Sequence, residues 1–115
     1  MNTHQKVDID DKIMIFRIAR TFSRGMSDAE ILKITRRAWK VGERRNKADY
    51  ALAVVHDQVV AAFTIRYWQS SDNEPGRWEF EGVNAPDAIC EKYVGKNVAD
   101  YFKSGQTNPV LYINC

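Results

Sequence analysis

The sequence predicts an α+β fold: a small mixed β-barrel or a bent five-stranded sheet, with one main helix and short helices at its ends. Three observations support this prediction. Five short segments are rich in apolar and β-branched residues, one early segment has apolar residues at helical spacing, and two short segments near the end begin after proline or glycine. At 115 residues the chain can bury one core. We therefore expect a flexible leader over residues 1–11 and a single domain over 12–115.

The first strand and the main helix follow from local signals. Residues 12–19 are mostly apolar and predict a strand, which the SRG tripeptide at 23–25 interrupts. Ser27 and Glu30 have the spacing of a capping box, in which each side chain bonds to the other's backbone N–H. Apolar residues at three- and four-residue spacing then predict a helix that runs to about Val41.

The middle of the chain reads as three strands. Residues 50–55 and 59–68 are apolar runs with a short polar link between them, which predicts a hairpin. Residues 69–76 have the composition of a surface loop. Residues 77–82 alternate between aromatic and charged side chains, as a half-buried strand does. A strand-rich centre of this kind favours one sheet.

Two short helices and a closing strand complete the predicted fold. Pro86 suits the first turn of a helix over 86–94, and a second short helix is expected over 96–103. Residues 108–115 form the last expected strand. Asn108 precedes a proline, so it initiates a turn or, as the alternative, contacts a base edge.

Charge is distributed very unevenly along the chain. Residues 12–47 contain eleven lysines and arginines against three acidic residues, although the formal net charge of the whole chain is only +2. Such a basic block predicts a surface that meets an anion, most often a nucleic-acid backbone. The candidate phosphate-binding residues lie on the predicted helix and in the loop after it: Lys33, Arg36, Arg37, Lys40, Arg44, Arg45 and Lys47. The alternative is a solvated helix face.

The order of elements resembles the PUA-like superfamily, in particular its ASCH and EVE domains. The resemblance rests on IMIFRI, the helix after it, the run ADYALAVVHDQVVAAFTIRYW and the strand RWEFEG. The stretches KYVGKNVADYFKSG and NPVLYINC, with RRAWKVGERRNKADYALAV, are also similar to an uncharacterised bacterial and phage domain found with GIY-YIG-type nucleases. This chain has no nuclease core of that type. The resemblance implies binding of RNA or DNA.

EVE-type members of the PUA-like superfamily hold a modified or flipped base in a pocket, and the resemblance implies such a pocket here. Aromatic rings provide stacking surfaces for bases, although for any single tryptophan the core is the favoured interpretation, with Trp39 as the best exception. The residues that we expect to rim the pocket are Trp39, Tyr50, Trp68, Trp78 and Asn108. Our leading hypothesis is therefore a non-enzymatic nucleic-acid-binding module.

Two other hypotheses belong to different classes. A small hydrolase acting on a modified nucleoside or nucleotide would need a carboxylate base, for which Asp49, Glu79 and Glu81 are the candidates. A protein-interaction factor in a phage or bacterial defence context would use the basic face against an acidic partner. No motif specifies a reaction, so the enzyme hypothesis is the weaker one and no cofactor is expected.

The remaining composition excludes several classes. There is no apolar run near the length of a membrane span and no signal-peptide core, so we expect no membrane partner. Cys90 and Cys115 do not suggest a disulfide framework, which favours a reduced, cytoplasmic protein. With only His4 and His56 available, no metal-ligand spacing is present.

Overall fold

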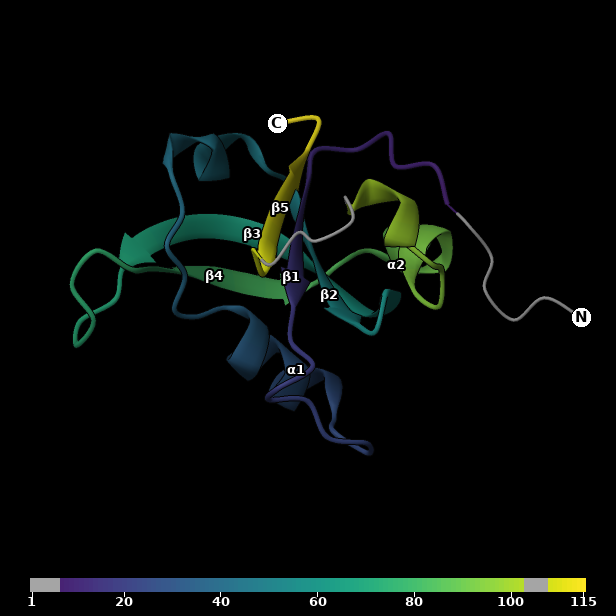
Figure 1. Ribbon diagram of the computed structural model, residues 1–115, viewed down its shortest axis with the longest axis horizontal. Coiled ribbons are helices and arrows are strands. Elements are labelled where there is room, and N and C mark those ends of the chain that lie inside the picture. Colours follow the sequence, from purple (N-terminus) through teal and green to yellow (C-terminus); the bar gives the residue numbers. More distant parts are fainter. Residues whose placement is uncertain (1–6, 103–107) are drawn as a thin grey trace, which may run out of the picture.

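The computed structural model describes residues 7–102 and 108–115. A five-stranded mixed sheet forms its centre, with the strand order β4-β3-β2-β1-β5 (Figure 1). The elements, in chain order, are β1 (Ile13–Arg17), α1 (Asp28–Thr35), η1 (Glu43–Lys47), β2 (Tyr50–Val55), β3 (Gln58–Ser70), β4 (Trp78–Asn84), α2 (Asp87–Tyr93), η2 (Ala99–Tyr101) and β5 (Val110–Ile113). The α+β expectation is confirmed. The edge strands β4 and β5 do not pair, so the sheet is open and the barrel alternative is wrong.

Strand pairing explains the connections. The strands β2 and β3 are antiparallel and joined by a two-residue turn in which His56 and Asp57 have φ angles of 48° and 68°, the conformation of a type I′ hairpin turn. In contrast, β1 pairs with β2 in parallel, and a parallel pair needs a long crossover. The crossover, residues 18–49, contains α1 and η1. The basic block is thus largely the connection between two central strands.

The sheet is covered on both faces because successive strand residues point to opposite sides. Ala51 and Ala53 of β2 belong to a core cluster that also contains Phe16 and Phe80, and α1 packs on this side. Leu52 of β2 belongs to the second cluster, which packs against α2 and η2. The small residues of β2 let the aromatic rings of the first cluster approach the sheet closely.

The helix α1 begins as predicted but is much shorter. Ser27 and Glu30 form the capping box, with both reciprocal hydrogen bonds present. The helix ends at Thr35 and not near Val41, so the prediction of a helix to that residue is wrong. The reason is tertiary: after Thr35 the chain pairs with the edge of β4. The N–H of Phe80 donates to the carbonyl oxygen of Arg36 (2.9 Å).

The pairing between this segment and β4 continues at Trp39. Trp39 and Trp78 exchange two backbone hydrogen bonds, each 2.9 Å long, and form an isolated β-bridge. These bonds use the N–H and carbonyl groups of Trp39, which in a longer helix would make intrahelical bonds. The predicted basic loop after the helix is also ordered differently, since Glu43–Lys47 forms a 3₁₀ helix.

The C-terminal region follows the prediction in part. The helix α2 lies within the predicted 86–94 segment, whereas the second helix is reduced to the single turn of η2. Residues 103–107 lie outside the described part of the chain, and they include the last residue of the predicted 96–103 helix. The closing strand covers four residues of the expected 108–115 segment.

Residues 7–11, which the sequence assigns to a flexible leader, lie against the C-terminal elements. Ile9 is buried and its N–H donates to the hydroxyl of Tyr101 (2.7 Å). Lys92 of α2 pairs with Asp10 and with Asp11. Residues 1–6 of that predicted leader lie outside the described residues.

Candidate nucleic-acid interface

Arg36, a predicted phosphate ligand, is held inside the fold. Its Nε donates to the carbonyl oxygen of Phe80 (3.0 Å). Its Nη2 lies 2.8 Å from Oε2 of Glu79 and 3.2 Å from Oε2 of Glu81. Its side chain is 21% exposed. These contacts fasten the end of α1 to β4 and compensate the guanidinium charge. Arg36 is thus a cationic partner of both Glu79 and Glu81.

Arg37 shares one of these carboxylates, that of Glu79, and also pairs with Glu74. It lies 3.6 Å from Glu79 and 3.5 Å from Glu74. Burial by itself would raise the pKa of Glu79. The hydrogen bonds from Gln69 and Arg36, together with the positive charge of Arg36, outweigh the effect of burial, so the pKa of Glu79 is lower than usual. A lowered pKa does not suit a general base at neutral pH. This weakens the case for Glu79 as a catalytic residue.

The second pair of arginines contacts aromatic rings. The guanidinium carbon of Arg45 lies 3.6 Å from the centroid of the Trp78 ring, and that of Arg44 lies 4.6 Å from the Tyr112 ring. Both also donate to backbone carbonyl oxygens, Arg45 to that of Gly42 and Arg44 to that of Cys115. No side-chain carboxylate among the described residues pairs with Arg44 or Arg45. Stacking uses the face of a guanidinium and leaves N–H groups at its edge.

The predicted lysines are exposed, and within residues 7–102 and 108–115 none of them forms an ion pair. Lys47 lies on η1, and Lys40 lies in the segment before it. Lys33 lies on α1, which is on the far side of the strands from η1 in Figure 1. The structure therefore does not gather the seven predicted cations on one surface.

A smaller cationic surface remains around η1. We define this η1 surface as the side chains of Arg44, Arg45 and Lys47 on η1, with Arg66 on β3. Arg45 and Arg66 line the same cavity, which brings the two elements together. Arg66 was not among the predicted ligands because it lies in an apolar strand, and only the strand alternation could have indicated that it faces outward.

The five predicted pocket residues do not form one pocket. Trp39 packs on Phe16, with 5.1 Å between ring centroids, and its Nε1 donates to the carbonyl oxygen of Thr35. Tyr50 packs with the cluster on the opposite face of the sheet. Asn108 accepts a hydrogen bond from the N–H of Val110 (3.0 Å), which is the turn alternative.

Trp68 and Trp78 have different surroundings. Trp68 packs edge-on against Phe80, with centroids 5.3 Å apart, and is half-buried. Trp78 supports Arg45 through the cation–π contact. Trp39 also lines a cavity of about 510 Å³ with Arg17 and Arg20. The tryptophans thus serve mainly as packing and as supports for cations.

The cavity beside η1 has the chemistry closest to the predicted pocket. It measures about 420 Å³ and lies between η1 and the second half of β3. Its lining residues are Arg45, Asn46, Ala48, Asp49, Ile65, Arg66, Tyr67 and Trp68. Arg45 and Trp68 each contain a buried N–H group, Nε and Nε1 respectively, that has no hydrogen-bond partner among the described residues. We call this cavity the η1–β3 cavity.

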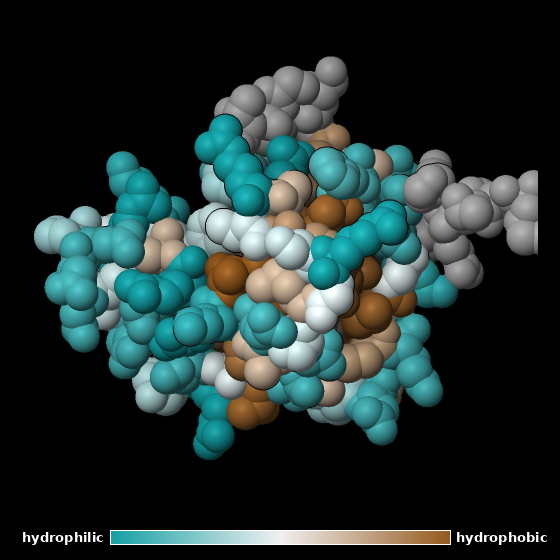
Figure 2. All heavy atoms as spheres, turned by 90° about the horizontal axis from the view of Figure 1, so that it is seen from below, coloured by the Kyte–Doolittle hydropathy of each residue, from teal (hydrophilic) through white to brown (hydrophobic). Residues whose placement is uncertain are grey.

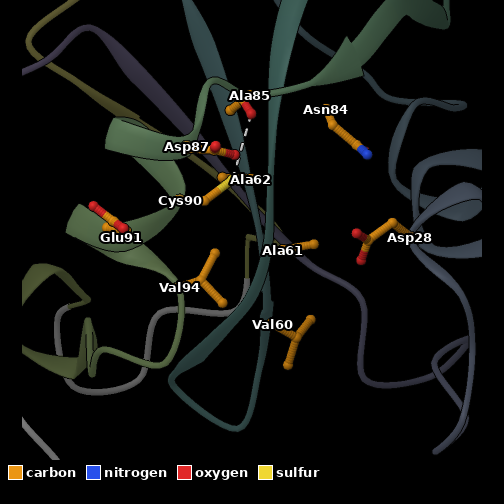
Figure 3. A pocket seen from close by; sticks show the side chains of 10 residues that line it. All are labelled: Asp28, Val60, Ala61, Ala62, Asn84, Ala85, Asp87, Cys90, Glu91 and Val94. Carbon is orange, nitrogen blue, oxygen red and sulfur yellow. Dashed lines mark hydrogen bonds between the residues drawn. The ribbon is translucent and has the colours of Figure 1, made fainter.

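A second cavity has the opposite charge. It measures about 450 Å³ and lies between α2 and α1 over the first half of β3 (Figure 3). Its floor is apolar, while Asp28, Asp87 and Glu91 stand at its margin. The space-filling view in Figure 2 shows hydrophobic residues in the middle of the lower face and hydrophilic ones around them. Three carboxylates would repel a phosphate backbone, so this α1–α2 cavity is a poor nucleic-acid site.

A metal site, a reactive cysteine and a membrane-spanning helix find little support in the described residues. They contain no group of three histidine, cysteine or acidic side chains that could hold a metal. The pKa of the Cys90 thiol is raised by burial and by Asp87, which disfavours the thiolate. None of the helices in this part of the chain has the length and hydropathy that a membrane span requires.

Comparison with known proteins gives no assignment. No protein-family model, curated protein or solved structure matches this chain.

Proposed function

We propose that the protein is a nucleic-acid-binding module and that the η1 surface contacts the phosphate backbone. The proposal rests on the contacts of two arginines. Arg44 and Arg45 stack on aromatic rings, and neither has a side-chain carboxylate partner among the described residues. Guanidinium groups held in this way keep edge N–H donors for phosphate oxygens. Each phosphate contact releases condensed counterions, so the contributions of several clustered cations multiply in the binding constant.

We further propose the PUA-like assignment that the sequence resemblance implies. The open five-stranded mixed sheet with helices on both faces supports it at the level of the fold class. RNA and DNA are both candidate ligands. A cytoplasmic location remains a prediction from the sequence, as does the absence of catalysis.

The test is fluorescence-anisotropy titration of the full chain with labelled single-stranded RNA, single-stranded DNA and duplex DNA at two salt concentrations. We expect binding that weakens steeply with salt. The variant Arg44→Ala/Lys47→Ala should bind roughly tenfold or more weakly, and its salt slope should fall by about 0.7–0.9 for each phosphate that it no longer neutralises. Arg45 is left unchanged because it also packs on Trp78.

The matched control is Arg24→Ala/Lys33→Ala, which removes the same charge from exposed positions off the η1 surface. It should bind like the wild type. Equal weakening in both variants would show that net charge and not the η1 surface governs binding. No binding to any probe at low salt would reject the proposal and favour the protein-interaction hypothesis. Turnover of a nucleoside panel would instead favour the hydrolase hypothesis.

A further inference from the structure

The α1–α2 cavity has carboxylates at its margin that the rest of the described chain does not neutralise. Asp28 lies on α1, and Asp87 and Glu91 lie on α2. Figure 3 shows Asp28 and Asp87 on opposite sides of β3, with the apolar floor between them. All three acidic residues are exposed, and within residues 7–102 and 108–115 none of them forms an ion pair. An occupant of this cavity should therefore carry positive charge.

The floor of the same cavity adds an apolar surface. It is formed mainly by valines and alanines, among them Val60 and Ala61 of β3 and Val94 of α2. Val94 is 38% exposed, and it is one of the few large hydrophobic side chains among the described residues that are exposed at all. Single exposed apolar residues are ordinary, but an apolar surface rimmed by polar residues is typical of an interaction site. The matching occupant is an apolar side chain that has cations beside it.

The chain itself carries a surface of that composition. Tyr67 is 55% exposed, the largest exposed fraction among the large hydrophobic residues that the structure describes. It lines the η1–β3 cavity together with Arg45 and Arg66 of the η1 surface. Among the described residues of that lining, Asp49 is the one carboxylate, so cations outnumber acids there. An aromatic ring among cations is the complement of an apolar floor among carboxylates.

The two surfaces cannot meet within one molecule. The α1–α2 cavity uses residues 60–62 of β3, whereas the η1–β3 cavity uses residues 65–68 of the same strand. A strand holds successive residues about 3.3 Å apart along one direction, so these two stretches stay separated. A contact between the surfaces must therefore join two copies of the chain. Because the surfaces differ, the contact is head-to-tail and leaves one of each kind free at the ends.

We propose that the α1–α2 cavity is a docking site for a second copy of this chain, whose Tyr67 enters between the carboxylates and whose Arg66 pairs with them. The tyrosine ring covers the apolar floor, which removes Val94 from water. The opposite charges of the two surfaces guide the copies together. The docked copy uses its η1 surface for this contact, so self-association competes with the phosphate contact proposed above.

The experiment is sedimentation velocity of the full chain over a range of protein concentrations, without nucleic acid, at low and at high salt. At low salt the average mass should rise with concentration, and at high salt it should return to that of one chain, because salt screens the charges. The variant Asp87→Asn/Glu91→Gln should weaken the association roughly tenfold. The matched control is Asp57→Asn/Asp72→Asn, which removes the same charge from exposed positions outside the cavity and should associate like the wild type.

A second variant removes the other half of the contact. In Arg66→Gln/Tyr67→Thr the α1–α2 cavity is intact but the inserted side chains are missing. Neither variant should associate alone, whereas an equimolar mixture of the two should form pairs and nothing larger, because each copy then keeps one working surface. If the double variant does not fold, Arg66→Gln, which changes only an exposed side chain, replaces it in the mixture.

Three results would overturn the proposal. The first is a wild-type protein that stays a single chain at every concentration at low salt. The second is equal weakening by the control, which would mean that net charge alone governs association. The third is a mixture of the two variants that contains only single chains. If the wild type stays a single chain but its cavity binds a labelled peptide with tyrosine between lysines and arginines, the occupant is a basic segment of another protein and not a second copy.

These outcomes are separate from those of the nucleic-acid proposal, because self-association is measured without nucleic acid. A strand that binds the η1 surface should dissociate the assembly into single chains. An assembly that binds such a strand without dissociating would show that docking does not use the η1 surface, and it would overturn the docking proposal while leaving the phosphate-binding proposal in place.

Discussion

Two neighbouring pairs of arginines in the same basic block contact different kinds of side chain. Arg36 and Arg37 lie against the carboxylates of Glu74, Glu79 and Glu81, so their charges are compensated within the fold. Arg44 and Arg45 lie against the rings of Tyr112 and Trp78, and no side-chain carboxylate among the described residues pairs with them. The same type of side chain thus stabilises the fold in one place and is a candidate phosphate-binding group in another. The tertiary partner decides which role a cation takes.

The largest effect that would test this comparison is on stability. Replacing Arg36 with methionine leaves Glu79, whose side chain is only 12% exposed, without its closest cation. We expect a decrease of about 2–3 kcal/mol in the free energy of unfolding, since removing one partner of a partly buried ion pair is costly. Urea unfolding measures it. Nucleic-acid binding at a temperature where the variant is folded should be unchanged.

The matched control for that substitution is Arg24→Met, which removes an exposed arginine. Its effect should lie within about 0.5 kcal/mol. If Arg36→Met were as mild as this control, the carboxylate contacts would not stabilise the fold. If it weakened binding as strongly as Arg44→Ala/Lys47→Ala, the division between the two arginine pairs would be wrong.

A smaller effect should follow from removing the ring beneath Arg45. In Trp78→Leu the guanidinium no longer has its cation–π partner, an interaction worth about 0.5–1 kcal/mol. We expect nucleic-acid affinity to fall about threefold without a change in the salt slope, because no charge is removed. Anisotropy titration over a salt series measures both the affinity and its salt slope. A changed slope would mean that Arg45 has left the interface altogether, and not merely that its support is missing.

The smallest expected effect concerns pH. The pKa of Glu79 is lower in the folded protein than its usual value of 4.5, so the unfolded chain binds more protons near that pH. The stabilisation is therefore present above about pH 4.5 and is lost as the pH falls further. We expect a contribution below about 1 kcal/mol. Urea midpoints between pH 3 and 6 should show a smaller acid-induced decrease in Glu79→Gln than in the wild type.

Several features of the fold were accessible from local sequence. The capping box at Ser27 and Glu30 and the hairpin after Val55 depend on residues within a few positions, and both are present. The end of α1 was not accessible, because the backbone of Arg36 pairs with that of Phe80, which is distant in the sequence. The apolar spacing up to Val41 indicated a longer helix, and the pairing with β4 replaced it.

The candidate site shows the same limit. The sequence showed a basic block with one tryptophan, Trp39, but not that Tyr50 packs on the opposite face of the sheet from Trp68. Arg66 and Tyr67 look like ordinary strand residues until β3 passes beside η1. No local signal could have placed them in a cavity with Arg45.

The sequence by itself determined the class of fold, the hairpin, the start of α1 and the unequal distribution of charge, because these depend on neighbouring residues and on composition. Only the tertiary structure decided that the sheet stays open, that the helix ends at Thr35, and that Arg36 contacts carboxylates while Arg44 contacts the ring of Tyr112. The physical reason is that charge compensation and strand pairing act through space, between residues that the sequence places far apart.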